Sequence, residues 1–307
     1  MFLILGVTAS GKGRLAFDLA QSTGAEIISI DSMKVYRRMD IGTAKPSQER
    51  RERIKYHLID IVEPSDSFSV GIFHEKALET IKQILARKKP VIAVGGTALY
   101  IKALLYGLFD GAGSDELIRT ELKNRQKAEG LEKLYLELTK IDPEAAERIS
   151  RNDARRIIRA LEVYQLTGKP ISSFQKQWAA PEPKHDWTII GLRRQKEDAS
   201  GRMNKRVKKM ITDGLVDEVK SLLSEEEPLS KQAGAAIGYA EIIEHLNGKI
   251  NLEDAIEQIK INTRRFAKQQ RTWFKTFKNI HWLDIEPDEP PEQILTRAKE
   301  LLKEKCD

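Results

Sequence analysis

The sequence predicts an α/β fold in which a parallel sheet carries a phosphate-binding loop. Over the first hundred residues, short apolar segments alternate with segments of helical periodicity. A glycine-rich loop with a lysine follows the first apolar segment, and from about residue 114 to 176 only helix signals occur. Alternating strands and helices are typical of a parallel sheet covered by helices. We therefore expect a P-loop parallel sheet flanked by helices, with an all-helical insertion domain and a helical C-terminal region.

Each predicted strand is a short apolar run bounded by turn residues. These runs are Phe2–Leu5, Glu26–Ile30, part of 56–62, Pro90–Val94, 186–192 and His281–Leu283. Helical periodicity predicts helices between them at Leu15–Gln21 and Ile72–Arg87. Because the run at 186–192 looks like a strand returning to the sheet, we expect the helical stretch before it to interrupt a single core.

The interrupting stretch contains two amphipathic segments, Leu131–Leu138 and Ala154–Leu166, with a helix start expected at Asp142-Pro143. The predicted boundaries give a catalytic core of residues 1–112 and 185–307 and a helical insertion of residues 113–184. The length of 307 residues is then explained by one interrupted core rather than by two domains in series.

Composition excludes several classes of protein. Charged residues are 32% and hydrophobic residues 40%, and no run of about 18 apolar residues exists to span a bilayer. The apolar start Met1–Leu5 stops at Gly6 without a basic region or cleavage site, so we expect no export. The single cysteine, Cys306, excludes an intrachain disulfide. We expect a cytoplasmic monomer with no membrane association.

Basic residues are concentrated in three clusters, although the net charge is only +6. Seven lie between Lys260 and Lys278 with no acid, and six of these are spaced as one helical stripe. The others are Arg193–Lys209 and Arg148–Arg159. A single cluster is often only a solvated helix face, but three favour a polyanionic partner. Ile259, Phe266, Trp273 and Phe277 form an opposing apolar stripe, and we expect Trp273 and Phe277 to be core residues rather than platforms for base stacking.

The motif that carries chemistry follows the first predicted strand and opens a helix. It consists of Gly6, Val7, Thr8, Ala9, Ser10, Gly11, Lys12 and Gly13. Glycines let backbone N–H groups surround phosphate oxygens, the helix start adds positive charge, and Lys12 reaches the terminal phosphates. The hydroxyl residue that normally follows the lysine and binds Mg²⁺ is Gly13 here. We expect Mg²⁺ near the loop, held by diphosphate oxygens, water and an acid elsewhere.

Asp31 ends the next predicted strand, 19 residues after Lys12. The carboxyl ends of parallel strands face the ligand crevice, so an acid there can bind a metal, accept a proton or hold a ribose hydroxyl. An aspartate that caps the following turn is the structural alternative.

Around Asp31 the sequence resembles the signature of bacterial tRNA dimethylallyltransferases, also called tRNA isopentenyltransferases. That segment is Asp31-Ser-Met-Lys-Val-Tyr-Arg-Arg-Met-Asp-Ile-Gly-Thr-Ala-Lys-Pro46. Further segments similar to family motifs are His57–Asp60, Val94–Tyr100, Asn152–Tyr164, Ala236–Tyr239 and Thr263–Trp273. The similarity runs from Gly6 to about Leu283, in the order and at the distances that the family shows.

The resemblance implies transfer of a dimethylallyl group from dimethylallyl diphosphate to N6 of adenosine 37 in tRNA. The P-loop then holds an isoprenoid diphosphate instead of ATP, and Asp31 is the general base. The resemblance implies that Arg202 and Arg206, with Lys12 and Mg²⁺, stabilise the diphosphate. Implied tRNA contacts are Asp31, Ser32, Met33, Lys34, Thr97 and Arg119.

Alternatives stay open at the level of sequence. Arg202 and Arg206 lie four residues apart, which also suits phosphate-backbone contacts or a solvated helix face. A P-loop small-molecule kinase normally has a hydroxyl residue at position 13, and its activity does not require three basic clusters. An adenylate isopentenyltransferase, acting on free nucleotides, needs no helical insertion. A further alternative is a non-catalytic tRNA-binding protein whose active site has decayed, and Gly13 is the only residue that supports this interpretation.

Overall fold

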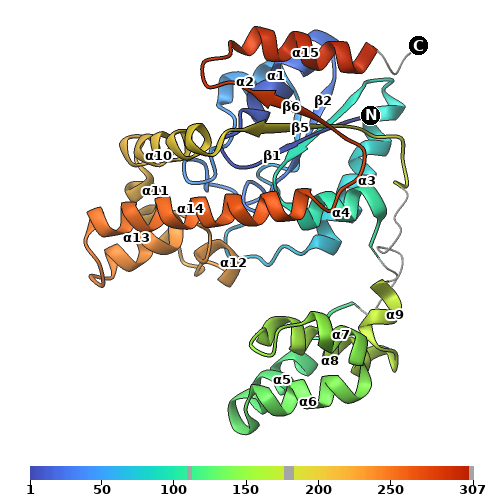
Figure 1. Cartoon of the computed structure of the whole chain (residues 1–307). Helices are drawn as coiled ribbons and strands as arrows, with labels where there is room; N and C mark the ends of the chain where they lie inside the picture. The colour runs from blue at the N-terminus through green and yellow to red at the C-terminus, as the bar shows by residue number, and fades with distance from the viewer. Residues whose placement is uncertain (109–112, 176–182, 304–307) are drawn as a thin grey trace. The chain divides into compact units, whose positions relative to one another are not determined.

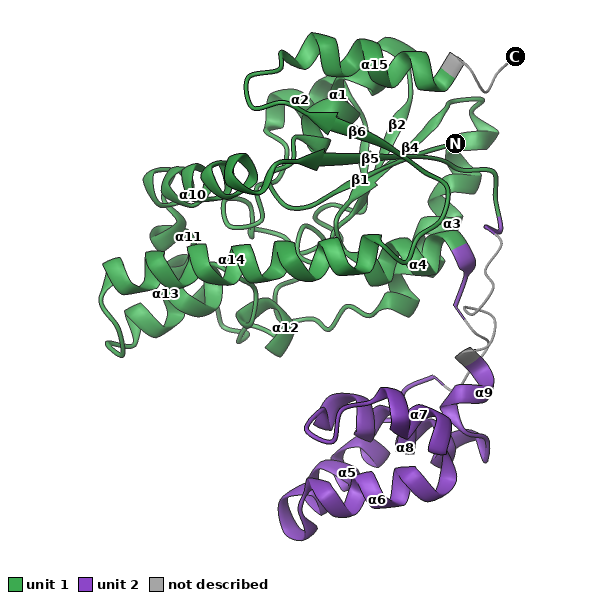
Figure 2. Cartoon of the chain, in the orientation of Figure 1, with its two compact units in different colours: residues 1–105, 185–307 green, residues 106–184 purple. Residues whose placement is uncertain are grey.

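A computed structural model describes residues 1–108, 113–175 and 183–303. The chain divides into two compact units, one of residues 1–105 and 185–307 and the other of residues 106–184 (Figure 2). The first unit contains the sheet, and the second is built from helices.

The first unit is organised around six parallel strands in the order β3-β2-β4-β1-β5-β6. They are β1 (Phe2–Gly6), β2 (Glu26–Ile30), β3 (Tyr56–His57), β4 (Val91–Gly95), β5 (Thr188–Arg194) and β6 (Ile280–Ile285). The predicted α/β sheet is therefore confirmed. All five residues of β2 are buried, as expected for a parallel strand covered on both faces.

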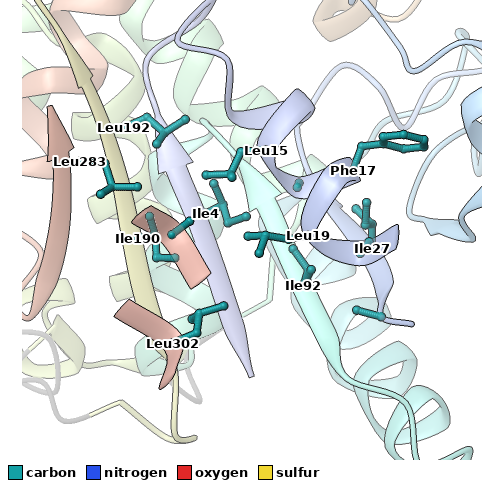
Figure 3. Packing of buried hydrophobic residues seen from close by; sticks show 14 of the residues in the cluster. Ile4, Leu15, Phe17, Leu19, Ile27, Ile92, Ile190, Leu192, Leu283 and Leu302 are labelled. Carbon is teal, nitrogen blue, oxygen red and sulfur yellow. The ribbon is translucent and has the colours of Figure 1, made fainter. Parts of the chain in front are cut away.

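Helices cover both faces of this sheet (Figure 1). The helices of this unit are α1 (Lys12–Thr23), α2 (Gln48–Arg53), α3 (Val70–Ala86), α4 (Ala98–Tyr106), α10 (Lys196–Thr212), α11 (Leu215–Leu223), α12 (Lys231–Gly234), α13 (Tyr239–Leu246), α14 (Leu252–Phe274) and α15 (Pro291–Lys303). One core layer lies between the sheet and α1 and α15, where Ile4 and Ile190 meet Leu15, Leu19 and Leu302 (Figure 3). Burial of each such side chain contributes about 1.5–3 kcal/mol.

The helical unit has a core of its own. Its helices are α5 (Glu116–Glu129), α6 (Leu131–Ile141), α7 (Pro143–Arg148), α8 (Ala154–Thr167) and α9 (Ile171–Gln175). Leu134 and Leu138 of α6 pack with Ile157 and Leu161 of α8, so both amphipathic segments bury the face that their periodicity marks. Asp142 is buried and starts α7 as expected, because one oxygen accepts from Ala145 N and the other from Ser172 N.

Helix α14 differs from the predicted continuous stripe. It ends at Phe274, so Lys275 and Lys278 lie beyond it. Its buried face includes the polar residues Thr263 and Gln270, whereas Phe266 is 38% exposed. Phe277 is buried as expected, whereas Phe266, on the same apolar stripe, borders a cavity instead of a packed surface.

Candidate functional site

A cavity of about 1090 Å³ opens at the carboxyl ends of the strands in the sheet-bearing unit. Loops after β1, β2 and β4 form one side, and helices α10 and α14 form another. Predicted site residues on its wall are Thr8, Ala9, Ser10, Gly11, Lys12, Gly13, Asp31, Ser32, Met33, Lys34, Thr97, Arg202 and Arg206. Tertiary structure thus brings together segments that are almost two hundred residues apart in sequence.

The P-loop adopts a conformation that leaves its helix start open to a ligand. Ala9 and Gly11 have positive φ angles of 61° and 100°, and α1 begins at Lys12. Arg202 Nε donates to Ala9 O over 3.1 Å, and Lys12 Nζ donates to Val7 O over 3.1 Å. Because side chains engage these carbonyl groups, the loop is held as an anion site at a helix N-terminus.

Arg194 supports the loop from the end of β5 and was not singled out by sequence. Its Nε donates to Ser10 O over 3.0 Å, and its Nη1 pairs with Asp198 over 3.0 Å. Its side chain is only 4% exposed, so it is a structural clamp of the P-loop. The sequence shows that the segment 193–209 is basic, but it does not show that Arg194 bonds to the P-loop.

Gln270 is a second residue that sequence reasoning missed. It is buried on α14, and its Oε1 accepts from Thr8 N over 2.9 Å. Its Nε2 donates to Gly96 O over 2.8 Å. One side chain therefore joins the P-loop to the loop after β4. In the sequence, the only indication of this role is that the glutamine lies within Thr263–Trp273, a segment similar to a family motif.

Asp31 stabilises the turn after β2 and also lines the cavity. Its Oδ1 accepts from Met33 N over 2.9 Å and from Lys34 N over 3.3 Å, which stabilises the turn after β2. In the described part of the chain, Oδ2 has no hydrogen-bond partner. The carboxylate lines the cavity, so one oxygen supports the turn and the other is left without a bond to the described residues.

Cations gather around this carboxylate. Burial, together with Arg206 and Lys34, lowers the pKa of Lys12 to about 7, and Asp31 opposes that shift. Burial also lowers the pKa of Lys34 and of Arg206, and Asp31 again opposes the shift. Several positive groups thus share one carboxylate, an arrangement that favours binding of a multiply charged anion.

Arg202 and Arg206 lie on one face of α10 and line the cavity. Burial lowers the pKa of Arg202, and Arg194 lowers it further. Arg206 Nη2 donates to Thr43 O over 3.4 Å, at the far end of the segment that follows Asp31. Because both side chains face the cavity, the solvated-face alternative is wrong for them.

Ser32 and Thr97 meet beside Asp31. Ser32 N donates to Thr97 Oγ1 over 3.2 Å, and Thr97 N donates to Ile30 O over 3.4 Å. A Cβ atom added to Gly95 would lie 2.0 Å from Ile30 O, so glycine permits this close approach. Arg119, in contrast, belongs to the helical unit, where it pairs with the buried Glu162 over 2.9 Å.

The segment after Asp31 is fastened to the helices by Glu218, which sequence reasoning also missed. Its Oε2 accepts from Asp40 N and Ile41 N over 2.9 and 2.8 Å. Its Oε1 accepts from Gly42 N over 3.2 Å and from the Tyr239 hydroxyl over 2.6 Å. A carboxylate thereby satisfies three consecutive amides and fixes the loop at the cavity wall.

A divalent metal fits this site only with help from a ligand. Among residues 1–108, 113–175 and 183–303 there is no group of three His, Cys, Asp or Glu side chains that would hold a metal. Mg²⁺ commonly keeps its waters and binds one or two carboxylates plus substrate phosphates. Asp31 Oδ2 and the buried Ser10 hydroxyl, which lacks a hydrogen-bond partner there, are oxygen donors that suit such an ion.

No helix within the described ranges is both long and apolar enough to span a membrane.

Comparison with known proteins decides the family. The family model described as IPP transferase matches residues 34–277. The chain belongs to the IPP transferase family. A tRNA dimethylallyltransferase of Geobacter metallireducens is 46% identical over 284 residues, which is 92% of each chain. One of Acetivibrio thermocellus is 43% identical over 98% of this chain and 97% of the relative.

Solved structures of IPP transferases share the fold. The full-length tRNA isopentenylpyrophosphate transferase of Bacillus halodurans has 38% identity and a TM-score of 0.72, covering 99% of this chain and 97% of that one. A eukaryotic dimethylallyltransferase acting on tRNA has 29% identity and a TM-score of 0.84, covering 99% of this chain and 79% of that one. The family likeness therefore extends over both units.

Proposed function

We propose that this IPP transferase moves the dimethylallyl group of dimethylallyl diphosphate to N6 of adenosine 37 in tRNA and releases diphosphate. The observation that carries the proposal is one cavity whose wall carries the Lys12, Arg202 and Arg206 cations together with the Asp31 carboxylate. A phosphate cradle and a carboxylate in one space suit a transfer from a diphosphate to a weakly nucleophilic amine.

Diphosphate departure is the first chemical requirement. The bond between C1 of the dimethylallyl group and its diphosphate oxygen breaks, and the electron pair stays on the diphosphate. Lys12, Arg202, Arg206 and the loop N–H groups stabilise that charge as it develops. Bound Mg²⁺ supplies further neutralisation of the diphosphate. The Ser10 hydroxyl is the protein oxygen proposed to hold the ion, together with diphosphate oxygens and water, so that Asp31 Oδ2 stays available.

Attack by adenine is the second requirement. The exocyclic amine is a poor nucleophile because its lone pair is delocalised into the ring. Asp31 accepts a hydrogen bond from N6, takes its proton as the N6–C1 bond forms, and so acts as general base. The free Oδ2 supports this role, since Oδ1 already accepts two backbone bonds.

The tRNA is gripped by residues around the cavity mouth and by the helical insertion of residues 113–184. The adenosine is unstacked from the anticodon loop to reach the cavity. Proposed tRNA contacts are Asp31, Ser32, Met33, Lys34, Thr97 and Arg119, with backbone phosphates held by the clusters Lys260–Lys278 and Arg148–Arg159. We further propose that the enzyme works as a monomer in the cytoplasm.

Mass spectrometry of tRNA after incubation with pure protein, Mg²⁺ and dimethylallyl diphosphate tests the proposal. We expect one added dimethylallyl group at adenosine 37. Parallel reactions replace tRNA with AMP or ATP as acceptor, or supply ATP as donor to small acceptors. Prenylated free nucleotide without prenylated tRNA would support the adenylate enzyme instead, and phosphoryl transfer would support the kinase.

A further inference from the structure

Gln270 forms hydrogen bonds to two loops, and no other side chain in the described residues bonds to the same two backbone groups. Its amide accepts from Thr8 N over 2.9 Å and donates to Gly96 O over 2.8 Å. The residue is 4% exposed and borders the cavity. A buried amide that both donates and accepts is specific, because neither a carboxylate nor an apolar side chain satisfies both partners.

The two partners belong to two different loops that border the cavity. Thr8 lies in the P-loop, where the diphosphate is proposed to bind. Gly96 directly follows β4, the strand next to β2, and the following residue, Thr97, accepts from the amide of Ser32, which is adjacent to Asp31. Three hydrogen bonds, linked through the backbone from Gly96 to Thr97, therefore connect the P-loop to the residue after Asp31 by way of one amide.

The residues around the Gln270 amide leave the space that it occupies. A Cβ atom on Gly96 would lie 2.3 Å from Gln270 Nε2, so glycine leaves the space that the side chain fills. Helix α14, which carries Gln270, packs against α10, α13 and β1. The amide is therefore presented from a rigid element, which is what fixed positioning of two loops requires.

We propose that Gln270 is a positioning residue that sets the separation of the diphosphate cradle from Asp31. The proposal rests on the function proposed above. Transfer requires the reacting carbon and N6 to approach within bonding reach, and a displacement of about 1 Å costs on the order of 100-fold in rate. Gln270 touches neither reacting atom in this arrangement and acts through the two loops.

A double-mutant cycle gives the first test. Gln270→Ala lowers kcat by about 100-fold while the KM for dimethylallyl diphosphate changes much less, because the cations that bind diphosphate remain. Gly96→Ala displaces the amide and also lowers kcat in the wild-type background. In the Gln270→Ala background, Gly96→Ala causes no further loss, because the added methyl group then has room. Gln269→Ala, at the exposed neighbouring position, is the control and leaves kcat unchanged.

Gln270→Glu gives a second test, because the pH dependence of its kcat would not change if the role of Gln270 were purely structural. An ionised carboxylate can accept from Thr8 N but cannot donate to Gly96 O, whereas a protonated one does both. The ratio of variant kcat to wild-type kcat therefore rises as the pH falls. Gln269→Glu shows no such rise. A flat ratio for Gln270→Glu, or additive losses in the cycle, would overturn the proposal.

Hydrogen exchange at the Thr8 amide separates this inference from the function proposed above. With inorganic diphosphate bound, the amide exchanges faster in Gln270→Ala than in wild type or Gln269→Ala, whatever acceptor the enzyme uses. Unchanged exchange would contradict the positioning role even in an active enzyme. Absence of prenylated tRNA with the wild-type protein would contradict the function while leaving the exchange result intact.

Discussion

The hydroxyl of Tyr239 donates a 2.6 Å hydrogen bond to Oε1 of Glu218, whose carboxylate also accepts from the amides of residues 40 to 42. A Cβ atom on Gly42 would lie 2.4 Å from the Tyr239 ring, so glycine is what lets the ring and loop meet. This pair fixes the loop whose Thr43 carbonyl accepts from Arg206 in the cavity.

Glu218→Gln is expected to destabilise the fold and loosen that loop. Either orientation of the new amide places an NH₂ group against a donor, so exposed or part-buried N–H groups of residues 40 to 42 lose their acceptor at a cost of about 0.5–1.5 kcal/mol for each hydrogen bond. Tyr239→Phe removes one hydroxyl only and is expected to cost about 1 kcal/mol. Urea denaturation measures both, and equal stabilities of Glu218→Gln and wild type would refute the assignment.

Asp31→Asn is expected to fold normally and to lose activity by about 10²–10⁴-fold. The asparagine Oδ1 still accepts from Met33 N and Lys34 N, but the amide cannot take a proton. Asp31→Ala loses both roles, so it should melt at a lower temperature than Asp31→Asn. Rates of prenyl transfer and melting curves give the comparison, and a wild-type rate in Asp31→Ala would eliminate Asp31 as base.

Binding of inorganic diphosphate is expected to take up a proton above pH 7. In the free protein the pKa of Lys12 is lowered to about 7, so the amine is mostly neutral at pH 8. An anion beside it favours the charged form and raises that pKa. Affinity should therefore decline as pH rises above 7, by at most about tenfold per pH unit.

Calorimetry in two buffers with different ionisation enthalpies counts the protons taken up. Lys12→Ala is the control, because proton exchange by diphosphate itself persists in that variant. Identical proton uptake by Lys12→Ala and wild type at pH 8 would contradict the assignment.

Gly13→Thr is expected to leave folding unchanged and to strengthen Mg²⁺ binding in the presence of diphosphate. A Cβ atom at this exposed position meets no atom within 4 Å, so the side chain has room. The hydroxyl restores the usual metal ligand of a P-loop. Gly13→Val, of the same shape without a hydroxyl, is the control. Equal Mg²⁺ requirements of the two variants would mean that the loop binds its ligand without a hydroxyl contact to the metal.

Much of the fold and part of the site were predictable because local patterns carry them. Apolar runs bounded by turns mark the strands, and their alternation with helices implies a parallel sheet. Asp31 and the P-loop were then expected at the same sheet edge because both follow strands. The family likeness agrees with these patterns, while the individual roles of the residues remain predictions.

Gln270 and Glu218 were not predictable in this way. Gln270 bonds to Thr8, which lies 262 residues away, and Glu218 bonds to Asp40, which lies 178 residues away. A helical pattern marks which face of α14 is buried only where that face is apolar, so a buried glutamine looks like a surface residue. Phe266 is the opposite case, because an aromatic residue beside a cavity has the sequence pattern of a core residue.

The sequence by itself determined the sheet, the phosphate loop and an acid at the neighbouring strand end, because each depends on residues close together along the chain. Only the tertiary structure decided what surrounds them: Arg194 and Gln270 on the P-loop, Glu218 on the loop after Asp31, and Arg202 and Arg206 in the cavity. The physical reason is that a buried polar group must find its partner in space, and folding chooses that partner from distant segments.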